Sequence, residues 1–544
     1  MKANISEPNV KKVFLKKSLS LYLQIYVLKN RNTLYAIGEI KHTPLGKFMN
    51  TITAVLPFQS QLVLENTLRP ILQSPLIEKV IVVHDGAFTA QLPKCEGIKG
   101  VSITAGNTLN KLIETIEAGF LLVVNQSHEI QIPPGTLERL IDVAAATDAG
   151  MVYSDYLEKR NGKLAEHPVN PYQTGSIRDE FDFGQMLLFS ISAIHRALRK
   201  FGPIADVRYA GLYDLRLKVA IDNRFFHIRE FLYTVIDLEI ETDKKTSSGE
   251  SIFDYVDHRN QAAQKEMELV VTQHLKYIND FLDPQFMKVP VTEDSFPVEA
   301  SVVIPVRNRV KTIADAVKSA LSQKTDFPFN VIVVDNHSAD GTTTALAALA
   351  GQYPAIKHLI PSRLDLSIGG CWNEAVFSEF CGRYAVQLDS DDLYGSPETL
   401  QKIIAMFRKG DFAMIIGSYT LVNESLREIP PGLIDHREWT DDNGRNNALR
   451  INGLGAPRAF DTGLLRKIGF PNVGYGEDYA VALRVSRHYR IGRIYESLYL
   501  CRRWEGNTDA ALTIEKRNRN DAYKDSIRTI EIMVRQKLVR NKNT

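Results

Sequence analysis

The chain repeats one order of strands and helices, and this repeat limits the possible folds more than any other feature of the sequence. Residues 51–86 and 299–342 each read as an apolar strand, a proline, a polar loop, an amphipathic helix and a second apolar strand that leads into aspartate. Downstream, residues 110–140 align with 373–403 without a gap, at a constant offset, because 373 − 110 and 403 − 140 both equal 263. Any two strand–helix–strand segments resemble each other to some degree, but an ungapped match of this length favours an internal duplication.

Each copy alternates strands with helices, which predicts an α/β unit built on a mostly parallel sheet. The segment "VIVV" at 331–334 is apolar throughout, as expected of a strand covered by helices on both faces. Sheets of this kind bind ligands beyond the carboxyl ends of their strands. Asp335 and Asp389 both follow such strands, so we expect them to face one crevice.

Prolines and the limits of the two copies suggest how the chain is divided. Residues 283–300 carry three prolines between the copies, which is typical of a linker. We expect five parts: an N-terminal extension at 1–48, a first α/β unit at 49–284, a linker at 285–298, a second α/β unit at 299–510 and a C-terminal helix at 511–544.

Composition excludes several classes of protein. The net charge of +2 gives no reason to expect a nucleic-acid partner. The four cysteines form no CxxC pair and no zinc spacing, so we expect reduced thiols in a cytoplasmic protein. No segment reaches the roughly 18 uninterrupted apolar residues of a membrane span. Peripheral contact with the inner face of the membrane, through the basic end of the last helix, is a second expectation.

The segment "VQLDSDD" at 386–392 ends an apolar run on three aspartates, Asp389, Asp391 and Asp392. Neighbouring carboxylates repel one another unless water or a cation separates them. Oxygen ligands suit Mg²⁺ or Mn²⁺, and a site with one or two carboxylates leaves positions that phosphate oxygens fill. The pattern therefore predicts a site for a metal and a diphosphate. An acidic turn before the helix at 396–407, with Ser396 as its N-cap, is the structural alternative.

Four segments in one order carry a more specific resemblance. "SVVIPVRNR", "VIVVDNHSADGT", "LDSDD" and "GYGEDYAVALR" resemble motifs of the family 2 glycosyltransferases with the GT-A fold. The resemblance covers 299 to about 505 well and 50 to about 285 in degenerate form. It implies two tandem GT-A units, Rossmann-like with a mostly parallel mixed sheet, followed by a C-terminal helix.

The resemblance implies a role for each matching position. Asp478, with Glu477 beside it, would be the general base, and Asp389 and Asp391 would form the DxD pair that holds Mn²⁺ or Mg²⁺. Arg502 and Arg503 would clamp the diphosphate, since guanidinium matches phosphate geometry. The residues expected at the nucleotide are Pro305, Arg307, Asn308, Asp335, Asp389, Asp391, Arg502 and Arg503. Helix capping by Glu477 and Asp478, and a solvated basic edge at Arg502 and Arg503, are the structural alternatives.

The activity that the resemblance implies is an inverting, metal-dependent transfer of a hexose or N-acetylhexosamine from a nucleotide-sugar. UDP is the commonest nucleotide of the family, and the acceptor would be a glycan or a lipid-linked sugar in bacterial surface polysaccharide synthesis. The loop at 438–460 is rich in glycine and asparagine, so we expect it over the acceptor. The expected acceptor contacts are Trp439, Asn452, Arg458 and Trp504. A sugar-1-phosphate nucleotidyltransferase would need a glycine-rich loop after the first strand. The loop of the second unit, "PVRNRVKT", has no glycine, so this class is disfavoured.

The first unit has lost the acidic pattern. At the constant offset, Gln126, His128 and Glu129 stand where the second unit has its three aspartates. The pair Glu477–Asp478 is replaced by Tyr213 and Asp214. We expect this unit to have lost donor chemistry and to serve as a packing partner or an acceptor-glycan surface. Two alternatives stay open: a polysaccharide polymerase with both units active, and a non-catalytic glycan-binding scaffold.

Overall fold

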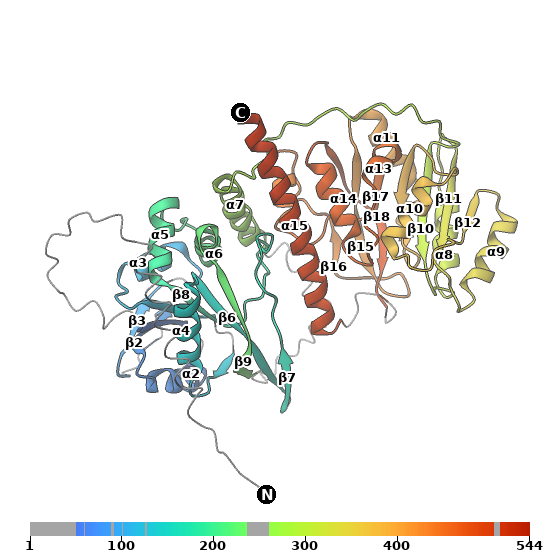
Figure 1. The fold of residues 1–544 in the computed structure, drawn as a ribbon. Coiled ribbons are helices and arrows are strands. Elements are labelled where there is room, and N and C mark those ends of the chain that lie inside the picture. The colour runs from blue at the N-terminus through green and yellow to red at the C-terminus, as the bar shows by residue number, and fades with distance from the viewer. Residues whose placement is uncertain are drawn as a thin grey trace, which may run out of the picture. The chain divides into compact units, whose positions relative to one another are not determined.

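The computed structural model describes residues 50–58, 60–86, 88, 92–100, 102–125, 128–236, 260–504, 507 and 512–543. The expected N-terminal extension at 1–48 lies outside these residues, as does Gln126. The described chain forms two mixed sheets with helices around them, followed by one long helix (Figure 1). Among the described residues, no helix combines the length and apolarity that crossing a membrane requires.

The first sheet has the strand order β3-β2-β1-β4-β8-β6-β9-β5, with β7 paired to β6. Its strands are β1 (Ile52–Pro57), β2 (Ile77–His84), β3 (Cys95–Lys99), β4 (Phe120–Val124), β5 (Glu129–Gln131), β6 (Met151–Arg160), β7 (Lys163–His167), β8 (Met186–Ser190) and β9 (Phe225–Ile236). Its helices are α2 (Gln61–Gln73), α3 (Gly106–Glu114), α4 (Thr136–Thr147), α5 (Ile191–Phe201), α6 (Gly211–Asp222) and α7 (Gln261–Tyr277).

The second sheet has the order β12-β11-β10-β13-β17-β15-β18-β14, with β16 paired to β15. Its strands are β10 (Ala300–Val306), β11 (Phe329–Asp335), β12 (Ile356–Leu359), β13 (Tyr384–Gln387), β14 (Leu393–Tyr394), β15 (Met414–Val422), β16 (Glu428–Ile434), β17 (Arg458–Asp461) and β18 (Ile491–Arg502). Its helices are α8 (Ile313–Leu321), α9 (Thr342–Gln352), α10 (Ile368–Phe377), α11 (Thr399–Lys409), α12 (Gly444–Asn447), α13 (Thr462–Ile468) and α14 (Glu477–Ser486).

The two sheets match strand for strand. The pairs β1–β2, β1–β4, β2–β3 and β6–β9 are parallel, and so are their counterparts β10–β11, β10–β13, β11–β12 and β15–β18. The antiparallel pairs correspond in the same way. The predicted α/β class and the two similar units are therefore confirmed.

Alternating burial explains why the central strands of the second sheet are apolar throughout. Val302 and Ile304 of β10 belong to a core with side chains of α8, α9 and α11, whereas Val303 belongs to a core with α10, α13 and α14. All three valine and isoleucine side chains are 0% exposed. Helices on both faces require strands that are apolar on both faces, as the sequence predicted.

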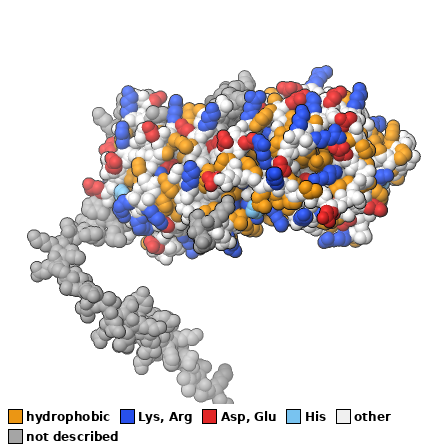
Figure 2. Space-filling model, turned by 90° about the horizontal axis from the view of Figure 1, so that it is seen from above, with side chains coloured by type: hydrophobic (Ala, Val, Ile, Leu, Met, Phe, Trp, Pro, Cys, Tyr) orange, Lys and Arg blue, Asp and Glu red, His pale blue; other side chains and the backbone are white. Residues whose placement is uncertain are grey.

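The last helix, α15 (Ile514–Asn543), confirms the predicted C-terminal helix and contacts both units. Its Asp525 accepts a hydrogen bond from Ser176 Oγ at 2.9 Å, and the Nε of its Arg528 donates to Tyr479 Oη at 3.0 Å. Residues 50–544 form one compact unit. Residues 285–298, the expected linker, contain no helix or strand. On the face drawn in Figure 2, basic and acidic side chains are intermixed, in keeping with the small net charge.

Candidate active site

The acidic segment follows β13 at the carboxyl edge of the second sheet and is held by neighbouring strands. Gln387 Nε2 donates to both carboxylate oxygens of Asp389, at 2.9 and 3.1 Å. The backbone N–H of Asp389 donates to Tyr499 Oη at 2.9 Å, and Asp392 Oδ1 accepts from the Arg502 N–H at 2.7 Å. The last two contacts come from β18, so a strand far away in sequence fixes the position of the acidic segment.

The carboxylates of this segment lie close enough to disfavour one another's charge. Burial, and then the charges of Asp389 and Asp391, raise the pKa of Asp392 well above its usual value. Burial also raises the pKa of Asp389 against the opposing effect of Arg458. A bound cation would stabilise carboxylates that repel each other in this way. Carboxylate oxygens are hard ligands that suit Mg²⁺ or Mn²⁺. The described residues contain no group of three or more acidic, histidine or cysteine side chains placed to hold an ion.

Asp391 lies where three segments meet. Its Oδ2 accepts from Trp504 Nε1 at 3.2 Å and from Asn507 Nδ2 at 3.5 Å, and lies 3.7 Å from Arg309 Nε. The guanidinium of Arg309 also lies over the Trp504 ring, 5.9 Å from its centroid. The structure thus places Trp504, expected at the acceptor, against a DxD carboxylate. Sequence reasoning missed Arg309 and Asn507, although Arg309 ends the segment "SVVIPVRNR" that it singled out.

The second acidic pair begins α14. Asp478 Oδ2 lies 2.8 Å from Arg458 Nη1, and Asp478 Oδ1 accepts from the Tyr479 N–H at 2.7 Å. Burial opposes ionisation of Asp478, but Arg458 and then Lys524 outweigh burial and lower its pKa. Burial, and then the charge of Asp478, raise the pKa of Glu477 to about 8. Two neighbouring carboxyl groups with pKa values moved apart are typical of an acid and base site.

One cavity of about 730 Å³ joins the two acidic pairs. Asp389, Asp391, Glu477 and Asp478 all line it, so the structure brings together the two motifs that lie 86 to 89 positions apart along the chain. The rest of its lining includes Pro305, Arg309, Arg458 and Arg503, together with Lys516, Arg519, Asn520, Tyr523 and Lys524 of α15. The α15 residues were missed, because their helix carries no motif and reaches the cavity through tertiary packing alone.

Asp335 and Asn308 organise the loops at the same edge. The Asp335 carboxylate is 0% exposed and accepts from the Ser338 N–H at 3.1 Å and from Thr343 Oγ1. Asn308 Oδ1 accepts from the Ala339 N–H at 2.8 Å. Asp335 does not line the cavity that holds Asp389, so the expected shared crevice contains only one of the two aspartates. Arg307, in the same loop as Asn308, is exposed.

Of three other expected contact residues, Trp439 and Arg502 are buried, and Arg458 lines the cavity. Trp439 is 4% exposed and packs against Gly444 in the core, which does not support a direct acceptor contact. Arg502 is buried and its Nη1 lies 3.5 Å from Asp315 Oδ2, so it is part of the frame around the acidic segment rather than an open clamp. Arg458 lies beside the expected general base, as described above.

In the first unit, Tyr213 and Asp214 stand in place of Glu477 and Asp478, and both make contacts within the fold. Asp214 Oδ2 lies 2.7 Å from Lys218 Nζ with both side chains buried, and also accepts from the Ala205 N–H at 2.8 Å. The Tyr213 hydroxyl donates to the backbone carbonyl of Ile177. The side chain of Asp214 is only 6% exposed, against 28% for Asp478, so a substrate hydroxyl has little access to this carboxylate.

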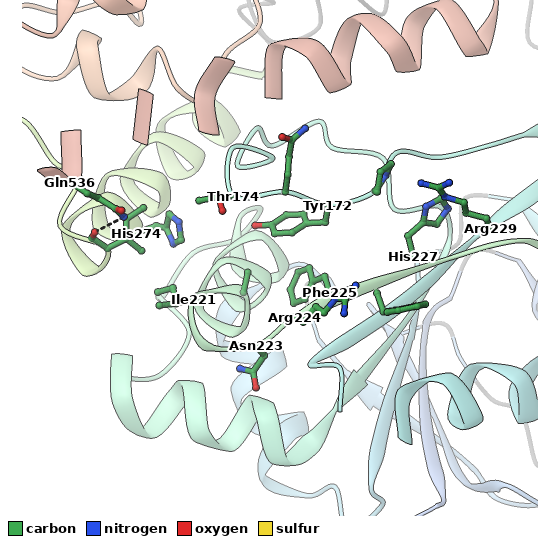
Figure 3. A pocket seen from close by; sticks show the side chains of 15 residues that line it. Tyr172, Thr174, Ile221, Asn223, Arg224, Phe225, His227, Arg229, His274 and Gln536 are labelled. Carbon is green, nitrogen blue, oxygen red and sulfur yellow. Dashed lines mark hydrogen bonds between the residues drawn. The ribbon is translucent and has the colours of Figure 1, made fainter. Parts of the chain in front are cut away.

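Another cavity, of about 640 Å³, is lined by residues of the first unit and by Gln536 of α15. It lies beside the end of α6 and the start of β9, and Figure 3 shows Tyr172, Phe225 and His274 among the side chains around it. His227 of this group lies 2.7 Å from Asp155, Nε2 to Oδ1. None of the residues aligned with the acidic motifs lines this cavity, so it is not the counterpart of the acidic cavity.

The second sheet places two carboxylate pairs and several cations around one cavity, at the carboxyl edge where α/β sheets bind their ligands. Residues 301–468 match the family described as Glycosyl transferase family 2. The chain therefore carries a family 2 glycosyltransferase domain at these positions, as the motifs predicted.

Other comparisons cover smaller parts or show lower similarity. Uncharacterized proteins of Mycobacterium bovis and Mycobacterium tuberculosis are 28% identical over 102 residues, which is 19% of this chain. The chain spans only 29% of the length of these relatives. Among solved structures, Staphylococcus aureus TarS 1–349 in complex with UDP-GlcNAc is similar with a TM-score of 0.33 and 22% identity, covering 44% of this chain and 72% of that one. The mannosyltransferase PcManGT from Pyrobaculum calidifontis, in complex with GDP-Man and Mn²⁺, has a TM-score of 0.30 and 17% identity, covering 53% and 85%.

Proposed function

We propose that the second unit transfers a sugar from a nucleoside-diphosphate sugar to an acceptor hydroxyl, with inversion at the anomeric carbon. The observation that supports this most strongly is the single cavity shared by the Asp389–Asp391 pair and the Glu477–Asp478 pair. The Asp389–Asp391 pair is suited to hold a metal at the donor's diphosphate. The Glu477–Asp478 pair is suited to accept the proton of the acceptor hydroxyl. A UDP-sugar is the expected donor, and a glycan or lipid-linked sugar of bacterial surface polysaccharide synthesis is the expected acceptor.

On the donor side, Asp389 and Asp391 would hold Mg²⁺ or Mn²⁺, which would supply positive charge to the diphosphate. The chain's own cations complement this charge. Arg309 lies beside Asp391, and Arg503, Lys516 and Arg519 line the same cavity. Fixed cations that face the leaving diphosphate stabilise the charge that develops on it during transfer.

On the acceptor side, Asp478 is the general base. Arg458 and Lys524 keep its pKa low, so it is ionised at neutral pH and can accept the proton of an acceptor hydroxyl. Glu477, with its pKa near 8, is mostly protonated at that pH and adds little negative charge beside the donor. Attack from the side of Asp478, opposite the leaving diphosphate, gives inversion in one step.

The first unit is proposed to lack a donor reaction. At the counterpart of Asp478, the carboxylate of Asp214 is buried with Lys218 and only 6% exposed, which argues against two active units.

A panel of nucleotide-sugars, each assayed for nucleotide release with Mn²⁺ or Mg²⁺, tests the proposal. We expect release from at least one donor, and calorimetry should detect binding of the same nucleoside diphosphate. Absence of both release and binding across the panel would favour a glycan-binding scaffold instead.

A further inference from the structure

A second cavity, of about 660 Å³, adjoins the catalytic one and extends it to the first unit. Asp389, Arg458, Tyr475 and Lys524 line both cavities, so the two spaces meet beside Asp389 and beside Arg458, the ion-pair partner of Asp478. The far wall of the second cavity comes from the first unit, through His167, Asn170, Arg178, Glu180 and Asp182. The first unit therefore contributes one side of a space that adjoins the catalytic cavity.

The loop that carries this wall is the counterpart of a loop in the second unit. Residues 168–185 join β7 to β8, and residues 435–457 join β16 to β17, which occupy equivalent positions in the two sheets. These equivalent loops contact each other. Asp179 Oδ2 lies 2.7 Å from Arg450 Nη1, and Asn452 Nδ2 donates to Glu180 Oε2 at 3.5 Å.

The wall is held firmly on α15. Buried Arg178 donates from Nε to Asp525 Oδ1 at 3.2 Å and from Nη1 to the Glu180 carbonyl at 2.9 Å. The Gly175 N–H donates to Thr529 Oγ1 at 2.8 Å. These bonds fix the backbone at Glu180, while the Glu180 side chain itself is exposed in the cavity.

The wall is also connected to the proposed base. Lys524 Nζ donates to the backbone carbonyl of Asn452 at 2.6 Å, and Lys524 is one of the two cations that lower the pKa of Asp478. A group bound beside Glu180 and Asn452 would therefore lie near Lys524, which acts on the charge of Asp478.

The polar side chains that line the second cavity are suited to bind a sugar. Carboxylates and side-chain amides accept from and donate to hydroxyls, and Glu180, Asp182, Asn170 and Asn452 supply such groups. Tyr475, 36% exposed, lies where the cavities meet and offers an aromatic ring to the apolar face of a sugar.

We propose that the β7–β8 loop of the first unit forms the acceptor subsite of the second unit, with Glu180 accepting hydrogen bonds from hydroxyls of an acceptor sugar. This inference rests on the transfer activity proposed above. It gives the duplicated unit a role in acceptor selection by the neighbouring active site.

The experiment uses the full chain, the best donor of the panel, and p-nitrophenyl glycosides of common hexoses and N-acetylhexosamines as acceptors. We expect at least one glycoside to accelerate nucleotide release. Desolvation, and then the charge of Asp179, raise the pKa of Glu180 to about 7, so the assay is run at about pH 8, where the carboxyl is mostly ionised. Glu180→Ala should then raise the KM for that glycoside about tenfold, the size expected when a hydrogen bond to a charged group is lost. The KM for the nucleotide-sugar depends on the other cavity and should change by less than about twofold.

Glu166→Ala is the matched control, because Glu166 is exposed on β7 and does not line the cavity. It should change neither KM. Glu180→Gln keeps the shape and removes the charge, so it tests the same role if the alanine variant unfolds. An unchanged acceptor KM in a folded Glu180 variant, or the failure of every glycoside to accelerate release, would overturn the inference. A failure of the transfer proposal looks different, because no donor would then release nucleotide at all, and the inference would fall with it.

Discussion

Asp179 and Arg450 form an ion pair between equivalent loops of the two units, with 2.7 Å between Asp179 Oδ2 and Arg450 Nη1. Both side chains are largely removed from water, at 9% and 0% exposed. Arg450 also donates to Gln264 and Asn447. Removing one partner of such a pair leaves an uncompensated buried charge, which costs more than the intact pair contributes.

Replacing Asp179 by Ala should therefore destabilise the chain by about 3 kcal/mol, measured by denaturant unfolding. Asp222→Ala is the control, because it breaks the exposed pair with Lys200 and should cost about 1 kcal/mol or less. Equal losses in the two variants would show that the contact between the loops contributes little to stability.

Replacing Asp478 by Asn keeps the size of the side chain and removes the proposed base. Transfer should fall by about two to four orders of magnitude in kcat, while the melting temperature stays close to that of the parent. Asp442→Asn, at an exposed position two residues before α12, should leave kcat unchanged. Asp478→Asn with full activity would exclude this residue as the base.

Protonation of Glu477 makes donor binding depend on pH. Its pKa of about 8 means that it is neutral below that pH and negative above it. The charges that face it are those of Asp478, Arg458 and Asp389, and Tyr523 of α15 lies nearby. The added negative charge repels the donor's diphosphate, so the KM for the nucleotide-sugar should rise above pH 8. Glu477→Gln stays neutral, and its KM should stay flat from pH 7 to 9; a rise of the same size in this variant would assign the effect to another group.

Local sequence predicted the parts of this site that lie at the ends of strands and helices. Asp391 and Asp478 could be found because a strand end and a helix start fix where each side chain lies. Local sequence did not predict which side chains are buried. Trp439 and Arg502 stand in polar segments, yet both side chains are buried in the fold. Lys524 had no signal, because a single helix pattern does not indicate which cavity its polar face will meet.

The carboxylate pair on the donor side should determine metal binding. Asp391→Asn removes one negative charge and should lower the affinity for Mn²⁺ by about tenfold or more, measured by electron paramagnetic resonance of free Mn²⁺ during titration. Asp365→Asn, which alters an exposed pair with Arg363, is the control and should not change the affinity. Equal Mn²⁺ affinity in the Asp391 variant and the parent would remove Asp391 from the metal site.

His274 should make the stability of the fold depend on pH. It is 7% exposed and lies beside the cavity of Figure 3, and burial lowers its pKa from 6.5 to about 3. Between these two values the unfolded chain binds a proton at this histidine and the folded chain does not. Stability is therefore lost as the pH falls below 6.5, by up to about 1.4 kcal/mol per pH unit.

His274→Gln removes this effect without adding a charge. Between pH 7 and pH 5 the parent should lose about 2 kcal/mol more unfolding free energy than the variant, measured by denaturant unfolding at both values. His195→Gln, at a partly exposed position of α5, is the control and should lose as much unfolding free energy between the two pH values as the parent. If His274→Gln shows the same loss as the parent, the acid sensitivity of the fold arises elsewhere and His274 is protonated in the folded chain as readily as in the unfolded one.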